Sequence, residues 1–281
     1  MRIFPYLRLV RAGTLFSPAA DVIAGLCLIQ AAWSTDAVRL IAASVCLYAS
    51  GMILNDHADH AIDAKLRPER PLPQGDISST QALLLGLGVL LAGLCTSPIP
   101  IYHGAMAALI LGYNYLLKKS PLLGAINMGT LRAMNLLVPA AWIDPSPENQ
   151  LVFIAAAGYG IYILSVTLLG ILEDAPRASR RAVLGLVCVP PLTSSLILYA
   201  ATPHPWPAAG LGFALSTCLL WHSRSGEWDQ RRIRGVMMWL LLGTMLYTGL
   251  LALACGRWPE AAVILLMIPP ARWIARTISL T

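Results

Sequence analysis

Long apolar stretches recur along the whole sequence, and they limit the possible folds more than any other feature. They lie at residues 15–34, 37–55, 80–97, 99–117, 122–143, 150–172, 182–201, 206–222, 235–255 and 258–275. About 20 apolar residues in a helix cross the hydrocarbon core of a bilayer. Of the 281 residues, 57% are hydrophobic and only 12% are charged. We therefore expect an all-α membrane bundle of nine to ten transmembrane helices, with residues 1–281 forming one integral-membrane domain.

The basic residues are distributed unequally between the ends of these stretches. With the N-terminus in the cytoplasm, only Arg39 and Arg257 face the opposite side, and Arg132 falls within a stretch. Every other Lys and Arg lies in a cytoplasmic segment, as the positive-inside rule requires. The net charge of +6 thus reflects orientation, and we expect the lipid bilayer, and no nucleic acid, as a partner. Residues 1–14 lack a small-residue cleavage site, so we expect no cleavable signal peptide.

A polar run ends the second apolar stretch on the predicted cytoplasmic side. Its amide and three carboxylates belong to Asn55, Asp56, Asp59 and Asp63. On a helix with about 100° per residue, these positions fall at roughly 0°, 100°, 40° and 80°, and so share one face. A charged group near a bilayer is costly unless it pairs, binds an ion or faces water. Hard oxygen ligands suit Mg²⁺, whose remaining coordination a diphosphate commonly supplies.

Two other interpretations of this polar run stay open. One is an ordinary solvated loop whose acidic residues offset nearby lysine and arginine. The other is a transition-metal site with Asp and His ligands. Against the second, His57 diverges from the carboxylate face and His60 only flanks it. We favour a cation site, because the oxygen ligands gather on one side of the predicted helix.

A longer motif makes this interpretation more specific. The pattern Asn-Asp-x-x-Asp-x-x-x-Asp begins at Asn55, and Arg-Pro-x-Arg-Pro-Leu-Pro-x-Gly-x-Ile-Ser begins at Arg67. Together they resemble the first aspartate-rich motif and following loop of the UbiA family of intramembrane prenyltransferases. Further similar segments are Arg8 and Arg11, Tyr113-Asn114-Tyr115-Leu116-Leu117-Lys118, and Gly129-x-x-Arg132-x-x-Asn135. The resemblance covers essentially the whole chain and is strongest to the bacterial UbiA-like EboC branch.

The resemblance implies a helical bundle around a central cavity, where two acidic motifs at a cytoplasmic mouth hold Mg²⁺ and a prenyl diphosphate. The implied metal ligands are Asp56, Asp59, Asp63, Glu173 and Asp174. The implied catalytic residues are Asp56, Asp59, Asp63 and Asp174. The implied substrate-binding residues are Asn55, Arg67, Arg70, Lys118, Lys119, Arg132, Asn135 and Arg177. The expected reaction moves an isoprenoid group from its diphosphate to a small polar or aromatic acceptor, in a bacterial inner membrane.

The second acidic motif departs from the family pattern. The family has three spaced aspartates there, whereas this chain has only Glu173 and Asp174, followed by Arg177. Either one metal is lost and arginine neutralises the diphosphate, or the protein binds a diphosphate lipid without turnover. Two alternatives stay open beside prenyl transfer: a UbiA-type isoprenoid cyclase, and a non-catalytic membrane carrier or transporter of a prenylated or polar metabolite. The intact first motif disfavours transport alone.

Arg132 lies in the middle of the fifth apolar stretch, where a charged side chain needs a partner. Candidate partners are Asp21 in the first stretch, a carboxylate of either acidic motif, and a bound anion. Asn135 lies one turn further along the same helix face. We expect Arg132 and Asn135 to line the cavity.

Overall fold

The computed structural model describes residues 3–144, 150–173, 179–201 and 228–278, together with the single positions 214, 217 and 221. The elements of this part are α1 (Phe4–Leu9), η1 (Ala12–Thr14), α2 (Phe16–Leu28), α3 (Thr35–Ala58), α4 (His60–Leu66), α5 (Ser79–Thr96), α6 (Pro100–Tyr115), η2 (Leu117–Lys119), α7 (Pro121–Trp142), α8 (Leu151–Glu173), α9 (Arg180–Ala201), α11 (Gln230–Ala254), α12 (Trp258–Leu266) and α13 (Ile268–Thr277). The predicted all-α class is confirmed.

The helices follow the apolar stretches of the sequence. Nine of the ten predicted stretches correspond to helices, and the other, 206–222, lies largely outside the described residues. Among the described residues, five helices are long and apolar enough to cross a membrane: Thr35–Ala58, Ser79–Thr96, Leu151–Leu172, Arg180–Ala200 and Gln230–Ala254. The tenth stretch forms α12 and α13, because Pro269 and Pro270 occupy the first turn of α13, where no backbone N–H is needed.

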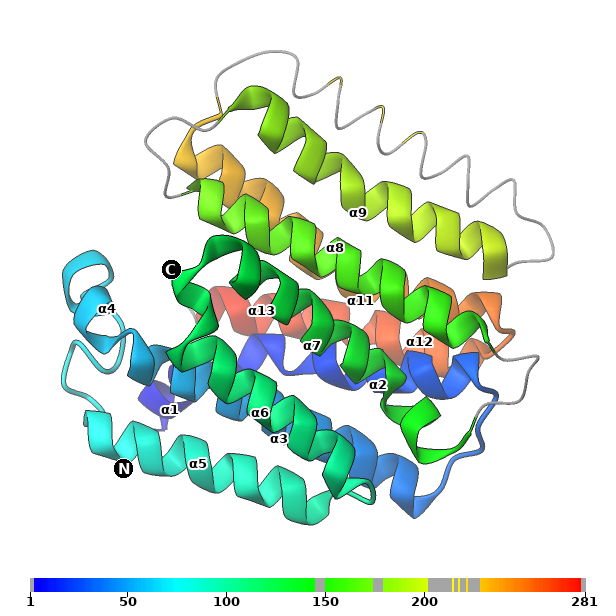
Figure 1. The fold of residues 1–281 in the computed structure, drawn as a ribbon, viewed down its shortest axis with the longest axis horizontal. Coiled ribbons are helices and arrows are strands. Elements are labelled where there is room, and N and C mark those ends of the chain that lie inside the picture. The colour runs from blue at the N-terminus through cyan, green and yellow to red at the C-terminus, as the bar shows by residue number, and fades with distance from the viewer. Residues whose placement is uncertain are drawn as a thin grey trace.

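The long helices lie side by side, with their axes roughly along one direction (Figure 1). In the described part, α5 packs on α3, and α7 packs on both α2 and α8, while α9 covers α8. The short helices α1 and α4 lie at one end of the bundle, which we call the mouth end (Figure 1). At the opposite end, Arg39 donates to the carbonyl of Thr96 at 3.0 Å and Arg257 to that of Ala31 at 3.3 Å. The two arginines that the sequence set apart therefore lie far from the mouth end.

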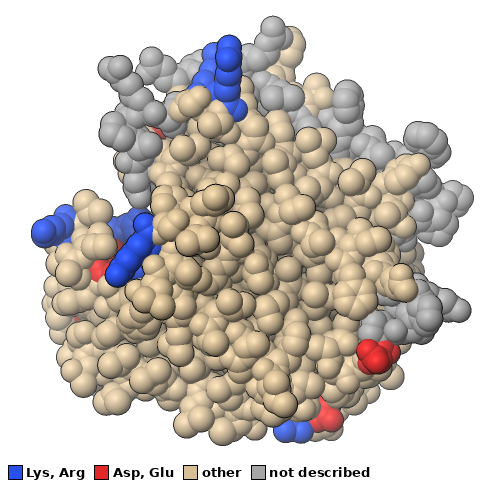
Figure 2. All heavy atoms as spheres, in the orientation of Figure 1, with Lys and Arg blue, Asp and Glu red and all other residues tan. Residues whose placement is uncertain are grey.

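The surface is uncharged over much of its area. Figure 2 shows a broad face with neither basic nor acidic side chains, and the charged groups gather near its edges. Large apolar side chains such as Leu84, Leu91 and Leu196 are exposed on the outer helices. In water, an apolar surface of this extent is costly. It is instead the surface that lipid contact requires, with charges kept to the two ends.

The N-terminal segment is fixed by the last described helix. Arg11 adopts a left-handed φ of 50°, which turns the chain from α1 into η1. Gly13 of η1 lies directly against α13, so a Cβ atom there would be 2.7 Å from the amide nitrogen of Ala275 and 2.8 Å from the carbonyl oxygen of Ala271. Only glycine allows this approach. The position of Arg11 therefore depends on α13.

Glycines also set the closest helix crossings. A Cβ atom on Gly129 of α7 would lie 2.5 Å from the carbonyl oxygen of Gly160 in α8. Gly86 and Gly93 of α5 face α3, whereas nothing lies within 4 Å of a Cβ added to Gly88. Small residues let membrane helices approach closely. Two of these three α5 glycines thus pack helices within one chain.

Replacing Gly129 by alanine is expected to destabilise the protein by about 1–3 kcal/mol, because the added methyl overlaps a backbone carbonyl that cannot rotate away. The matched control is Gly88→Ala, which faces open space. It is expected to stabilise the fold by up to about 1 kcal/mol, since alanine favours helix. Thermal unfolding in detergent measures both. Equal unfolding temperatures for the two variants would contradict the close crossing.

Candidate functional site

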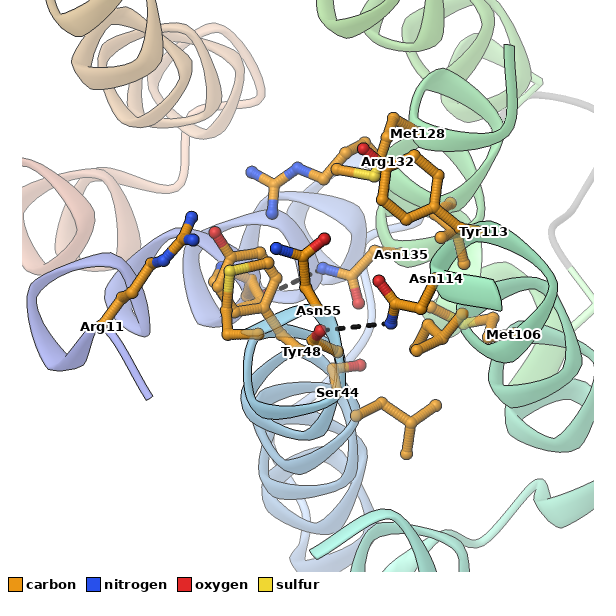
Figure 3. Close-up of a pocket in the computed structure, with 16 residues that line it drawn as sticks. Arg11, Ser44, Tyr48, Asn55, Met106, Tyr113, Asn114, Met128, Arg132 and Asn135 are labelled. Atoms are coloured by element: carbon orange, nitrogen blue, oxygen red, sulfur yellow. Dashed lines mark hydrogen bonds between the residues drawn. The ribbon is translucent and has the colours of Figure 1, made fainter. Parts of the chain in front are cut away.

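A cavity of about 190 Å³ lies between α3, α6 and α7 (Figure 3). Each helix lines it with side chains three or four residues apart, which places them on one helix face. The α3 residues are Ser44, Leu47, Tyr48, Gly51, Met52 and Asn55. The α6 residues are Met106, Ile110, Tyr113 and Asn114, and the α7 residues are Met128, Leu131, Arg132 and Asn135. Apolar walls with a few polar groups are typical of a small-molecule site.

Two buried carboxylates lie at the mouth end, next to this cavity. Asp56 is 4% exposed and Asp63 is 2% exposed. Arg70 bridges them, since its Nη1 donates to Asp56 Oδ1 at 3.2 Å and to Asp63 Oδ2 at 2.5 Å. Arg11, which lines the cavity, donates to the same oxygen of Asp56 at 3.1 Å. Burying two carboxylates is costly unless they are paired, and the two arginines provide the pairing.

Asp59 lies at a kink between α3 and α4. Its backbone angles, φ −92° and ψ 2°, leave the α-helical range, although the amide of Asp63 still donates to its carbonyl at 2.8 Å. The carboxylate accepts a hydrogen bond from Lys118 Nζ at 2.6 Å. The sequence predicted one regular helix through Asp63. This prediction is wrong, because the helix is interrupted by a kink at Asp59. The three carboxylates are consequently divided between two groups of basic partners.

The other predicted basic residues lie further out. Arg67 approaches Asp63 only to 3.8 Å and is 43% exposed. Lys119 is exposed and takes part in no ion pair within the described part of the chain. Arg8 donates to the carbonyl of Glu69 at 2.9 Å and so ties α1 to the loop after α4. The carboxylates therefore have their closest contacts with Arg11, Arg70 and Lys118.

The arrangement of the carboxylates bears on metal binding. Within the described residues, no group of three or more His, Cys, Asp or Glu lies close enough to hold a metal ion. Arg70 pairs with Asp56 and Asp63, whereas Lys118 pairs with Asp59. The donor set is nevertheless all oxygen, including the amide of Asn55, and this chemistry fits Mg²⁺. His57 turns away, with its Nδ1 3.1 Å from the hydroxyl of Tyr115. A metal ion held by all three carboxylates would therefore have to displace Arg70 and Lys118 from them.

Arg132, which lines one wall of the cavity, belongs to a buried ion pair. Arg132 Nη1 lies 3.1 Å from Asp21 Oδ2, and Arg132 Nη2 also donates to the hydroxyls of Tyr159 and Ser17. Asp21 accepts further hydrogen bonds from Tyr159 at 2.8 Å and from Asn135 at 2.9 Å. Of the three candidate partners for Arg132, the structure therefore selects Asp21. Arg132 and Asn135 line the cavity, as predicted.

Two residues that line the cavity were not predicted from the sequence, and part of the predicted site lies outside the described residues. Ser44 and Tyr48 were not predicted, although their spacing from Asn55 places all three on one face of α3. The guanidinium of Arg132 lies 5.8 Å from the ring centroid of Tyr48. In the second acidic motif, Asp174 and Arg177 lie outside the described residues, and so does the side chain of Glu173.

Comparison with known proteins gives a consistent result. The profile of the UbiA prenyltransferase family matches residues 22–242. The digeranylgeranylglyceryl phosphate synthase of Methanopyrus kandleri is 28% identical, over 86% of this chain and 97% of that protein. The enzyme of the same name from Ignicoccus hospitalis is 34% identical over 47% of this chain, and the match spans 45% of its length.

Solved structures show the same fold. A UbiA homolog from Archaeoglobus fulgidus, bound to GPP and Mg²⁺, superposes with a TM-score of 0.58 at 15% identity, covering 90% of this chain and 99% of that one. A structure described in work on digeranylgeranylglyceryl phosphate synthase in membranes superposes with a TM-score of 0.61 at 18% identity, covering 89% and 96%. At such identities the similarity concerns the fold.

Proposed function

Because this chain belongs to the UbiA prenyltransferase family, we propose that it is an intramembrane, Mg²⁺-dependent prenyltransferase. It moves an isoprenoid group from a prenyl diphosphate to a small polar or aromatic acceptor. The observation that carries the proposal is a set of carboxylates and basic groups at the edge of an apolar cavity. This set comprises Asp56, Asp59, Asp63, Arg11, Arg70 and Lys118. The archaeal homolog whose structure contains GPP and Mg²⁺ supports it.

The mouth residues are suited to hold a diphosphate. Asp56, Asp59 and Asp63 would hold Mg²⁺, which stabilises the charge of a departing diphosphate. Arg70 and Arg11 stand beside Asp56 at 3.2 and 3.1 Å, so their guanidinium groups are positioned to bind phosphate oxygens, which arginine does with two parallel hydrogen bonds. Preorganised charge of this kind is the main source of stabilisation for a leaving anion.

The cavity below the mouth is suited to the isoprenoid. Leu47, Met52, Ile110 and Leu131 present apolar walls. When the carbon–oxygen bond to diphosphate breaks, an allylic carbocation remains, and apolar walls keep water from attacking it. A positioned acceptor then attacks it instead. Diphosphate thus leaves at the polar mouth, while the isoprenoid carbocation stays between the apolar walls of the cavity.

Release of inorganic diphosphate tests the proposal. Purified protein in detergent is given geranylgeranyl diphosphate, with and without Mg²⁺, and with a panel of hydroxylated acceptors. Prenyl transfer predicts Mg²⁺-dependent release that an acceptor accelerates, with a prenylated product in the mass spectrum. Tight lipid binding without release under any condition would favour a carrier. Release with an internally cyclised product would favour a cyclase.

Replacing Lys118 by alanine is expected to raise the KM for the prenyl diphosphate by about tenfold or more, since a charge-assisted hydrogen bond contributes about 1.5–3 kcal/mol. Lys118 contacts Asp59 at 2.6 Å, at the mouth. The neighbouring Lys119→Ala is the matched control, because Lys119 is exposed. Its KM is expected to change less than twofold. Equal effects of the two substitutions would show that the lysines act only through overall charge.

We further propose that the mouth end faces the cytoplasm of a bacterial inner membrane. The support is the concentration of basic side chains at that end, opposite Arg39 and Arg257. A fluorescent protein fused after α13 should then fluoresce, as it does only on the cytoplasmic side. The EboC branch stays a prediction, because the relatives found are archaeal. The roles of Glu173, Asp174 and Arg177 in a second acidic motif also stay predictions.

A further inference from the structure

The cavity becomes less accessible with distance from the mouth end. Near that end its lining includes partly exposed side chains, namely Asn55 of α3, Tyr113 of α6 and Met128 of α7 (Figure 3). At the far end the last lining residues of the same helices are buried, namely Ser44, Met106 and Asn135. Accessible surface is thus lost in the same direction on all three helices. A passage that opened into lipid at depth would leave accessible side chains there instead.

Fully buried side chains close the cavity beyond these residues. One turn past Ser44, Met106 and Asn135, the same helix faces carry Leu40, His103 and Val138, which we call the floor. Each floor residue is 0% exposed and is not part of the cavity lining. Hydrogen bonds fix the floor, because His103 Nε2 lies 3.3 Å from Ser44 Oγ and His103 Nδ1 lies 2.6 Å from Ser97 Oγ.

Contacts between the helices also close the sides of the cavity. Asn114 Nδ2 of α6 donates to the carbonyl of Gly51 in α3 at 3.3 Å. The hydroxyl of Tyr102 in α6 donates to the carbonyl of Met134 in α7 at 2.9 Å. Helix α7 packs on α2, and α2 packs on α3, which completes a ring of four helices. An apolar tail that left the cavity sideways would have to separate two of these helices.

The depth of the cavity follows from helix geometry. Ser44 and Asn55 are 11 residues apart on α3, which corresponds to about 16 Å at a rise of about 1.5 Å per residue. An extended chain advances about 1.2 Å per bond, since three backbone bonds span about 3.5 Å. Along its main chain, a prenyl tail of fifteen carbons is therefore about 13 Å long, and a tail of twenty carbons about 18 Å. Only the shorter tail ends above the floor.

We propose that the cavity is closed at its inner end and selects prenyl diphosphates whose tail has at most fifteen carbons. The inference rests on the proposed prenyl transfer and specifies its donor. With C1 at the mouth, the tail runs along Met52 and Ile110 and ends at Met106. A tail of twenty carbons must bend back on itself or hold C1 away from the carboxylates. Geranylgeranyl diphosphate is therefore a slow donor.

Binding of inert donor analogues tests the inference on the full chain, in detergent with Mg²⁺. The probes are geranyl, farnesyl and geranylgeranyl thiolodiphosphate, in which sulfur replaces the oxygen between C1 and phosphorus. In an open passage each added isoprene unit buries more apolar surface and lowers the Kd. A closed cavity reverses the last step, because one methylene too many in an apolar pocket already costs about tenfold.

The Kd of the geranylgeranyl analogue, measured by calorimetry, is accordingly expected to be at least about tenfold above that of the farnesyl analogue. A Kd that is equal for the two analogues, or lower for the geranylgeranyl one, would overturn the inference. Both results are read without turnover, so they do not depend on knowing the acceptor.

Release of diphosphate from the three natural donors separates this inference from the proposed function. Mg²⁺-dependent release with the highest kcat/KM for farnesyl or geranyl diphosphate supports both. Release with geranylgeranyl diphosphate as the best donor keeps prenyl transfer and overturns the closed cavity. If no donor releases diphosphate but the expected order of Kd holds, prenyl transfer is wrong and the selection of the tail stands.

Replacing Met106 by alanine is expected to lengthen the cavity and to lower the ratio of the geranylgeranyl to the farnesyl Kd by about fivefold or more. Met245→Ala is the matched control. Met245 of α11 is 3% exposed against 4% for Met106, and it packs in the apolar core away from the cavity. Its variant should keep the ratio of the unmodified protein. The same ratio in both variants would show that Met106 does not limit the tail.

Replacing Ser44 by leucine acts in the opposite direction, because the larger side chain fills the inner end of the cavity. The farnesyl analogue is then expected to bind more weakly than the geranyl analogue. An unchanged order of the two Kd values in a folded Ser44→Leu protein would contradict the position of the inner end. This variant removes no packing, so it remains informative when Met106→Ala lowers the yield of folded protein.

Discussion

Replacing Asp56 by asparagine is expected to lower the rate of diphosphate release at least about a thousandfold, which corresponds to about 4 kcal/mol of transition-state stabilisation. The substitution keeps the shape of the side chain and removes its charge. Asp56 is in contact with both Arg11 and Arg70 and is buried next to the cavity. It therefore holds Arg70 together with Arg11, which lines the cavity. Single-turnover release of diphosphate at saturating Mg²⁺ measures the effect.

The control for this experiment lies on the same helix. Asp36, near the opposite end of α3, is exposed and pairs with Arg39 at 2.8 Å. Asp36→Asn should release diphosphate at the rate of the unmodified protein. Thermal unfolding of both variants separates loss of chemistry from loss of fold. A folded Asp56→Asn protein with full activity would show that the assignment of this carboxylate to the metal is wrong.

Replacing Arg132 by methionine is expected to destabilise the protein by about 3–5 kcal/mol, enough to leave little folded material after extraction. The reason is the charge left behind on Asp21, which is 1% exposed and keeps only the hydrogen bonds from Asn135 and Tyr159. The measurement is the yield of monodisperse protein and its unfolding temperature. Activity is expected to be lost with the fold.

A double substitution distinguishes charge from shape at this site. In the Asp21→Asn/Arg132→Met variant no charge remains buried, so a substantial part of the lost stability should return. The exposed pair of Asp36 and Arg39 gives the comparison, since breaking an exposed pair typically costs less than about 1 kcal/mol. If the double variant is no more stable than Arg132→Met alone, the ion pair is not the cause of the destabilisation.

The helices could be predicted from the sequence because a lipid environment strongly restricts the conformation of the backbone. Each span must satisfy its own backbone hydrogen bonds, so an apolar stretch of sufficient length becomes a helix whatever its neighbours are. The ends were less predictable. The stretch 37–55 became α3, Thr35–Ala58, because the polar run continues the helix beyond the apolar residues. The stretch 258–275 became two helices, and Pro269 and Pro270 lie in the first turn of the second, α13, where proline fits.

The contacts of the site could be predicted only where the partners are close in sequence, or where few charged residues were available as partners. Asp21 was a candidate partner for Arg132 because few carboxylates lie within the apolar stretches. The contacts of Asp56 with Arg11 and of Asp59 with Lys118 join residues 45 and 59 positions apart. No local pattern encodes them, since they depend on how α1, α3 and α6 are packed.

The contact between Gly13 and α13 has a consequence for biosynthesis. The ribosome makes α13 after all the long helices of the described chain, yet this helix supports the segment that positions Arg11 against Asp56. The mouth can therefore reach its final form only late, once translation has passed residue 277. Until then the nascent protein would hold a complete apolar chamber with an unfinished entrance.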